Sequence, residues 1–102
     1  LLFDAPIGIF VTIERYLAKG SWFDVGLYVQ TIMLAARAKG LHTCPQASWI
    51  VTPEPVYRHL DIPSDQMLVV GIALGHANET AIENTLVSPR EPVEAIAHFH
   101  GF

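Results

Sequence analysis

Apolar side chains cover nearly the whole circumference of a predicted helix that begins at Ser21 and ends before Lys39-Gly40. No charged residue occurs from Val25 to Ala36. A surface helix shows a polar face at a period of 3.6 residues, and this segment lacks one. The apolar run is also shorter than the roughly 20 residues needed to cross a bilayer. We therefore expect a helix buried on most sides, with Ser21 as its N-cap and a glycine stop.

Two further segments have the continuous apolar character of strands covered on both faces. One is Ile7–Ile13, and the other, Gln66–Gly75, is the clearest strand in the chain and is expected in the middle of a sheet. Gly71 inside that strand predicts that another group approaches the backbone closely. The segment from His76 to Pro92 is poor in apolar residues and is expected to be irregular.

Shorter patterns add a strand and a helix between these segments. Leu41–Cys44 reads as a short strand ended by Pro45. Thr52–Glu54 provides a hydroxyl cap, a proline and an acid, which together are typical of a helix start. Val56 and Leu60 lie one turn apart and would form the inner face of that helix. Alternating strands and helices predict an α+β or α/β domain, and the connection lengths leave that choice open.

The composition indicates that this chain does not cover all of its apolar surface by itself. It has 102 residues, 51% of them hydrophobic and 16% charged, and a mean hydropathy of +0.34. A domain of this size buries about two-thirds of its unfolded surface, so apolar patches should remain outside. We expect an obligate oligomer or a piece of a larger protein. The first residue is Leu rather than Met, which suggests a natural chain that starts earlier.

Charge and cysteine content narrow the class of protein further. A net charge of -4 with six Lys and Arg argues against nucleic-acid binding, which needs a basic surface. A single cysteine excludes an internal disulfide and suits a reducing, cytoplasmic setting. The opening residues show no basic segment and no cleavage site, so no signal peptide is predicted. We expect neither a nucleic-acid partner nor a membrane partner.

Two groups of side chains could carry chemistry on their own. His98 and His100 would share one face of a strand, and His76 could complete a zinc site, but no carboxylate or cysteine stands at ligand spacing. Cys44 could act as a nucleophile with His42 as its base, although a buried, inert thiol is the preferred interpretation. The acidic residues are scattered singly, so no acid/base pair is predicted.

The segment Pro45 to Trp49 and the cation Arg90 are the other candidates. The segment follows a strand and offers small side chains and backbone N–H groups beside an aromatic residue, which suits a flat heteroaromatic ligand. An ordinary surface turn explains the same residues equally well. Arg90 lies between Pro89 and Pro92, where a stiff backbone would favour a phosphate contact; a solvated arginine is the alternative.

Taken together, these segments resemble the C-terminal half of the FMN-dependent nitroreductase family. The resemblance rests on SWFDVGLYVQTIMLAARAKGLHTCPQASW, on VYRHLDIPSDQMLVVGIALG, and on Asn84 and Arg90. It covers nearly the whole chain, so residues 1–102 are expected to be the C-terminal part of a single nitroreductase-like domain. It implies an α+β fold (an α/β sandwich) with a mixed central sheet and a buried helix at the core of a dimer.

The resemblance also implies a function. Members are homodimers that bind FMN between their subunits and use NAD(P)H to reduce nitroaromatics, quinones or related acceptors. By this resemblance Pro45, Gln46, Ala47 and Ser48 lie against the flavin ring, with N–H groups near Gln46 and Ala47 facing its N5 atom, and Arg90 holds the FMN phosphate. The cofactor carries the hard chemistry in such enzymes, which explains why no catalytic side chain stands out.

The sequence departs from the family pattern in ways that leave other functions open. Many members have an acid and a glycine where Gln46, Ala47 and Ser48 stand here, and some have a lysine where Ser88 stands. The family's N-terminal arginine-containing phosphate motif lies before anything in this sequence. A non-catalytic dimerising module without flavin is therefore the main alternative, and a metal-binding module through the histidines is a third.

Overall fold

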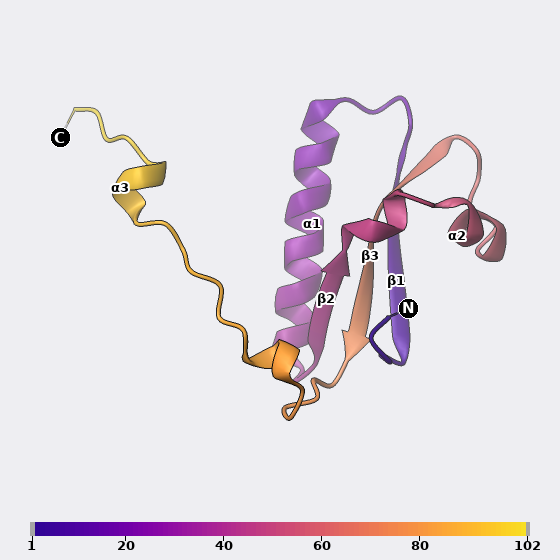
Figure 1. The fold of residues 1–102 in the computed structure, drawn as a ribbon. Helices are drawn as coiled ribbons and strands as arrows, with labels where there is room; N and C mark the ends of the chain where they lie inside the picture. The colour runs from indigo at the N-terminus through magenta and orange to yellow at the C-terminus, as the bar shows by residue number, and fades with distance from the viewer. Residues whose placement is uncertain (1, 102) are drawn as a thin grey trace.

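The computed structural model describes residues 2–101, in which the long apolar segments form a three-stranded sheet with one long helix against it (Figure 1). The strands are β1 (Ile7–Glu14), β2 (His42–Gln46) and β3 (Gln66–Gly75), and their order is β1-β3-β2. Both pairs are antiparallel. The predicted α+β class is confirmed, and the sheet that this chain contributes contains only antiparallel pairs.

The central strand β3 has the bounds that the sequence predicted. Leu68 and Ile72 on this strand are only 3% and 0% exposed, so the strand is the centre of the core. Gly71 pairs with Phe10 on one side and with Gln46 on the other. A register shift between Val11 and Thr12 interrupts the β1–β3 ladder. The strand therefore has a neighbour on each edge, as expected for the middle of a sheet.

The long helix α1 (Lys19–Ala38) begins two residues before the predicted N-cap Ser21. Its N-cap is Ala18, which makes no side-chain capping bond, so the Ser21 prediction is wrong. A serine near a helix start can also stand within the first turn, as it does here. The predicted stop is confirmed: Gly40 has φ +73°, and the Lys39 and Gly40 N–H groups donate to the Ala36 and Arg37 carbonyls.

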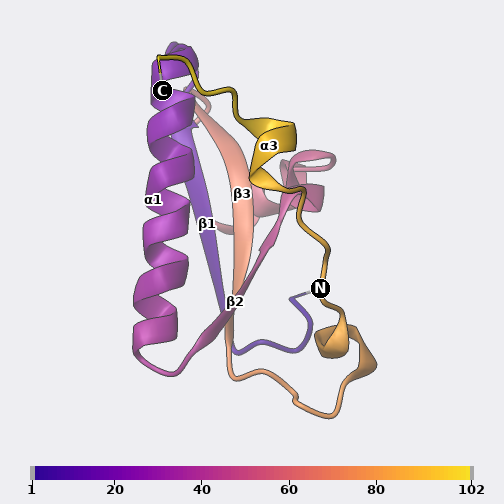
Figure 2. The same ribbon diagram turned by 90° about the vertical axis from the view of Figure 1, so that its left-hand side faces the viewer.

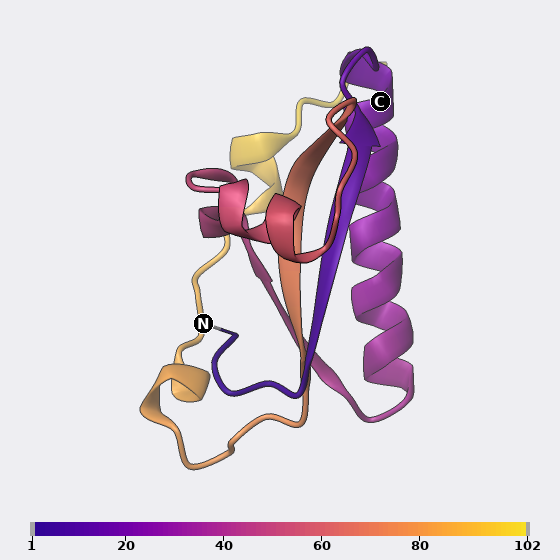
Figure 3. The same cartoon turned by 90° about the vertical axis from the view of Figure 1, so that its right-hand side faces the viewer.

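Only one side of α1 is covered by the described chain (Figure 3). Ala36 is buried, whereas large apolar residues on the other sides are 43–68% exposed; these are Trp22, Phe23, Leu27, Tyr28 and Leu34. The expectation of a helix buried on most sides is therefore wrong for the single chain. The physical reason is that the sheet lies on one side of α1, as Figure 3 shows, and leaves large apolar side chains of the helix exposed. No helix among residues 2–101 is long and apolar enough to cross a membrane.

The strand β2 runs further than predicted, because Pro45 is part of it. Pro45 pairs in register with Ile72, and Gln46 extends the strand by one more residue. A proline fits an edge strand, where its missing N–H group can face away from the neighbouring strand. The predicted end at Cys44 is therefore wrong.

The short helix α2 (Glu54–His59) buries one of the two residues predicted for its inner face and leaves the other exposed. Its N-cap is Pro53 and has no side-chain capping bond, so the predicted hydroxyl cap at Thr52 is wrong. Val56 is buried, as expected, but Leu60 is 46% exposed because the helix ends one residue earlier. Figure 2 shows α1 on one side of the sheet and α2 on the other.

The chain after β3 runs away from the sheet, as Figure 1 shows. It contains a single 3-10 turn, η2 (Ile82–Thr85), and a one-turn helix, α3 (Val93–Ile96). The predicted irregular character of His76 to Pro92 is confirmed apart from η2. Ile96 and Phe99 in this tail are 73% and 68% exposed.

Candidate functional site

The predicted flavin-ring segment is the end of a strand followed by one helical turn. Pro45 and Gln46 are the last two residues of β2, and Ala47 and Ser48 open the 3-10 turn η1 (Ala47–Ile50). Ala47 and Ser48 are both exposed. The four residues therefore span the junction between an edge strand of the sheet and the turn that follows it.

The turn η1 begins at exposed residues, Ala47 and Ser48. The first N–H groups of a helical turn have no acceptor within the turn, because the chain before them is not helical. Here these groups belong to residues with small side chains, Ala47 and Ser48, which leave the backbone open to an approaching ligand. The edge of a heteroaromatic ring fits this arrangement, and so does water.

Trp49 holds the turn against the sheet. Its indole Nε1 donates to Gln46 Oε1 at 3.2 Å. Its ring meets Phe10 edge to face, with centroids 5.3 Å apart and an interplanar angle of 85°. A Cβ atom at Gly71 would lie 2.5 Å from Trp49 Cδ1, so the indole occupies the space that the glycine leaves. The predicted close approach to the Gly71 backbone is confirmed, and the approaching group is Trp49.

Arg90 lies on the extended segment between η2 and α3, away from β2 (Figure 1). Its side chain is exposed and donates to the Ser88 and Pro89 carbonyls at 3.3 and 3.1 Å. The single chain therefore does not bring Arg90 together with Pro45–Ser48. Its assignment to a phosphate stays a prediction.

The thiol of Cys44 is exposed, so the expected buried cysteine is wrong. The reason is that β2 is an edge strand of the described sheet, and Cys44 borders an open hollow of about 720 Å³. Both ring nitrogens of His42 have neighbours other than Cys44. Its Nε2 lies 2.7 Å from Arg37 Nη1, and its Nδ1 lies 3.2 Å from the Ala77 backbone nitrogen.

The histidine-based metal site finds no support among the described residues. Within residues 2–101 no three His, Cys, Asp or Glu side chains gather in a way that could hold a metal ion. His98 and His100 lie beyond α3 in the tail, whereas His76 directly follows β3. The predicted triad is therefore not assembled in this chain.

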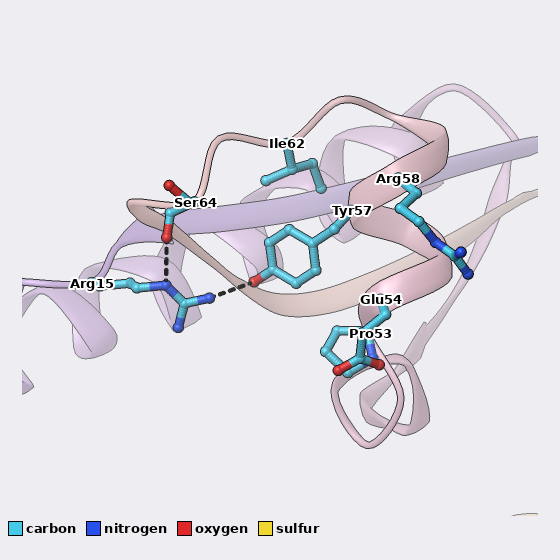
Figure 4. Close-up of a pocket in the computed structure, with 7 residues that line it drawn as sticks. All are labelled: Arg15, Pro53, Glu54, Tyr57, Arg58, Ile62 and Ser64. Carbon is cyan, nitrogen blue, oxygen red and sulfur yellow. Dashed lines mark hydrogen bonds between the residues drawn. The ribbon is translucent and has the colours of Figure 1, made fainter.

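A second hollow, of about 460 Å³, lies beside α2 and was not predicted (Figure 4). The Arg15 guanidinium at its edge donates from Nε to the Ser64 carbonyl at 2.8 Å and lies 3.4 Å from the Tyr57 hydroxyl. That hydroxyl also accepts from the Leu68 N–H at 2.7 Å. These contacts join the ends of β1, α2 and β3, so the group acts as a structural clamp. No sequence pattern signals it, because its members are far apart in the chain.

Comparison with known proteins decides the family. The model of the nitroreductase family matches residues 1–76, which is most of the chain. The chain belongs to the nitroreductase family. This membership confirms the resemblance drawn from the apolar helix and the segments around Pro45 and Gly71.

Individual members of the family show how close the relationship is. The chain is 44% identical over 100 residues to the 4-nitrobenzoate reductase of Pseudomonas putida, which covers 98% of this chain and 44% of that protein. The FMN and NADPH-dependent nitroreductase NfnB from Sphigopyxis sp. strain HMH superimposes with a TM-score of 0.94 at 34% identity, covering 98% of this chain and 45% of that one.

A third relative is the FMN-dependent nitroreductase NfnB from Mycobacterium smegmatis, whose structure was solved in complex with NADPH. It superimposes with a TM-score of 0.90 at 30% identity and covers 95% of this chain and 43% of that one. This nitroreductase-family chain thus spans less than half the length of the relatives that it matches.

Proposed function

We propose that this chain forms part of an FMN-dependent NAD(P)H oxidoreductase of the nitroreductase type, which reduces nitroaromatics, quinones or related acceptors. The observation that carries the proposal is the likeness over 98% of the chain to a nitroreductase that is FMN and NADPH-dependent. The 44% identity to a 4-nitrobenzoate reductase supports a nitroaromatic acceptor. Since the chain spans less than half of these relatives, the activity belongs to the whole enzyme.

The residues present fit the ring of FMN. The first N–H groups of η1, with the small side chains of Ala47 and Ser48 beside them, offer donors to an acceptor atom at the ring edge. Bound FMN would supply hydride chemistry, taking two electrons and a proton from NAD(P)H and passing two electrons to the acceptor. In this proposal Pro45–Ser48 would lie against the ring and would help to exclude water from it.

The phosphate contact is the second part of the proposal. Arg90 would bind the FMN phosphate through its guanidinium, which carries a permanent charge and donors in a fixed fork. Its present partners are backbone carbonyls within two residues, at 3.1 and 3.3 Å, and they leave other guanidinium N–H groups for a phosphate.

We also propose that the working unit is a homodimer in the cytoplasm. The large apolar side chains of α1 that the sheet does not cover would lie in the dimer core, where a second copy buries them. The exposed thiol of Cys44 suits a reducing compartment. The net charge of -4 supports the absence of a nucleic-acid partner.

The test uses the chain alone and the chain completed with the part of the Pseudomonas putida reductase that it does not match. We expect the completed protein to bind FMN and to oxidise NADPH with 4-nitrobenzoate as acceptor. Arg90→Ala should weaken FMN binding by roughly 10- to 150-fold, the loss of a hydrogen bond to a charged group. Arg58→Ala, which removes an exposed guanidinium from α2, is the matched control and should leave affinity unchanged.

The results separate the two parts of the proposal. Equal FMN affinity for Arg90→Ala and Arg58→Ala would show that the phosphate assignment is wrong while the cofactor assignment stands. A completed protein that binds no FMN would reject the oxidoreductase. In that case the flavin-free dimerising module would be the better description.

A further inference from the structure

The contact between Trp49 and Gly71 joins the candidate ring-binding turn to the central strand. Trp49 is the third residue of η1, immediately after Ala47 and Ser48. Gly71 lies on β3 and pairs in register with Gln46, the last residue of β2. The indole thus lies over the strand pair at the point where β2 ends and the turn begins.

Three independent contacts restrain this indole. The space above Gly71 accepts it, since a Cβ atom there would come within 2.5 Å of Cδ1 and 2.9 Å of Nε1. The Phe10 ring meets it edge to face at 5.3 Å, a favoured aromatic geometry. The indole N–H donates to Gln46 Oε1 at 3.2 Å. The indole therefore cannot rotate without losing at least one of these three contacts.

The hydrogen bond from Trp49 to Gln46 has a particular consequence for the backbone between them. It links two residues three apart and therefore closes a small loop that contains Ala47 and Ser48. The Val51 N–H donates to the Ser48 carbonyl at 3.1 Å and completes the same turn. These two hydrogen bonds restrain the backbone that carries the Ala47 and Ser48 N–H groups.

We propose that Trp49 is a positioning residue for the flavin. Because it packs on Gly71 and hydrogen-bonds to Gln46, it holds the N–H groups of Ala47 and Ser48 where they can donate to an acceptor atom at the edge of the ring. The inference rests on the proposed function and names a residue that acts through the turn without touching the cofactor. Gly71 contributes to this positioning, because only a residue without a Cβ lets the indole come this close.

Three variants and a control test the inference in the chain and in the completed protein. Trp49→Phe keeps an aromatic ring and removes the N–H bond to Gln46. Trp49→Leu removes the ring, and Gly71→Ala pushes the indole out of its seat. Gly20→Ala is the matched control, because a Cβ at Gly20 meets nothing within 4 Å.

The first measurement is amide hydrogen exchange by NMR without flavin. Exchange at the Val51 amide reports whether the turn is closed, and the β3 amides report whether each variant is folded. We expect Trp49→Phe to speed Val51 exchange by roughly 2- to 12-fold, the value of one neutral hydrogen bond. Gly71→Ala should speed it by roughly 5- to 150-fold, the range for an overpacked site. Unchanged Val51 exchange in all three variants would overturn the inference.

The second measurement is FMN affinity together with the visible circular dichroism of the bound flavin. We expect Trp49→Leu and Gly71→Ala to weaken binding by roughly 10- to 100-fold, the range known for residues that orient ligands of bound metals. The flavin dichroism should change in the same variants, Trp49→Phe should be intermediate, and Gly20→Ala should match the wild type. A looser turn with unchanged FMN affinity and dichroism would show a merely structural role and would contradict the inference.

Failure of the proposed function has a different signature. If the wild-type completed protein binds no FMN, the oxidoreductase proposal fails and the flavin part of this inference fails with it. The exchange data on Val51 then still decide whether Trp49 holds the turn.

Discussion

Tyr57 supplies hydrogen bonds to β3 where the neighbouring strand has ended. The ladder between β2 and β3 covers Gly71 to Gly75, so the first half of β3 has no β2 partner. The Tyr57 hydroxyl accepts from the Leu68 N–H at 2.7 Å and donates to the Gln66 carbonyl at 3.3 Å. One side-chain hydroxyl on α2 thus takes the place of a strand neighbour, and it fixes α2 to the sheet.

Removing only this hydroxyl should lower the free energy of unfolding by much more than the loss of one exposed atom would. Tyr57→Phe keeps the ring and leaves the Leu68 N–H without its partner in a residue that is 3% exposed. A buried donor left unsatisfied costs about 1–3 kcal/mol. We therefore expect the free energy of unfolding to fall by about 1–3 kcal/mol, with Tm lower by about 4–8 °C for each kcal/mol in a domain of about 100 residues.

Urea unfolding followed by circular dichroism measures this loss. The midpoint should fall while the slope with urea stays constant, which shows a change in stability without a change in the surface exposed. All samples need the same chain concentration, because association through exposed apolar surface would add to the apparent stability. Tyr28→Phe, at a tyrosine that is 60% exposed, is the control. Equal midpoints for the two variants would refute the assigned role of the Tyr57 hydroxyl.

Three further predictions concern the core, the end of α1 and a surface tyrosine. Ile72→Ala, at a fully buried residue, should cost about 2–5 kcal/mol in urea unfolding, whereas Ile82→Ala at a 79% exposed site should change little; similar losses would contradict the core assignment. Gly40→Ala should cost about 1–2 kcal/mol by the same assay, because φ is +73° there, and no loss would contradict the left-handed cap. The Glu14 carboxylate raises the pKa of Tyr16 above 10.0, chiefly by a hydrogen bond and also by its charge, so any stabilisation from this pair is present below pH 10.0 and lost as pH rises through the folded pKa. Glu14→Gln should lower that pKa towards its usual value in an NMR titration, and an unchanged pKa would reject the pairing.

Local patterns predicted the parts of the fold that local physics decides. The uninterrupted apolar run of β3 predicted a strand in the middle of a sheet, and β3 lies between β1 and β2. Gly71 within that run indicated a close approach, and the indole of Trp49 supplies it. Lys39-Gly40 indicated the end of α1, because the left-handed conformation that closes a helix favours glycine.

Features that depend on distant contacts could not be predicted in the same way. The clamp of Arg15, Tyr57 and Ser64 joins residues up to 49 positions apart, and no single segment reveals it. Pro45 alone suggests the end of a strand, and only the edge position of β2 explains why the strand continues through it. The apolar character of α1 shows that the helix needs cover, but not which of its side chains the described chain leaves exposed.

The candidate site stays a prediction. The structure shows that Pro45–Ser48 span the end of β2 and the start of η1, and the contacts of Trp49 with Gln46 and Gly71 could be found only in the structure. Arg90 was linked to the same site only through family resemblance, and the single chain places it on a separate segment (Figure 1).

The visible absorption spectrum after gel filtration tests the central claim most directly. The protein is the chain completed with the unmatched part of the Pseudomonas putida reductase, mixed with excess FMN and separated by size. Our account predicts flavin absorbance that elutes with a dimer-sized protein peak. A colourless protein peak, with all FMN eluting at the position of the free cofactor, would contradict it.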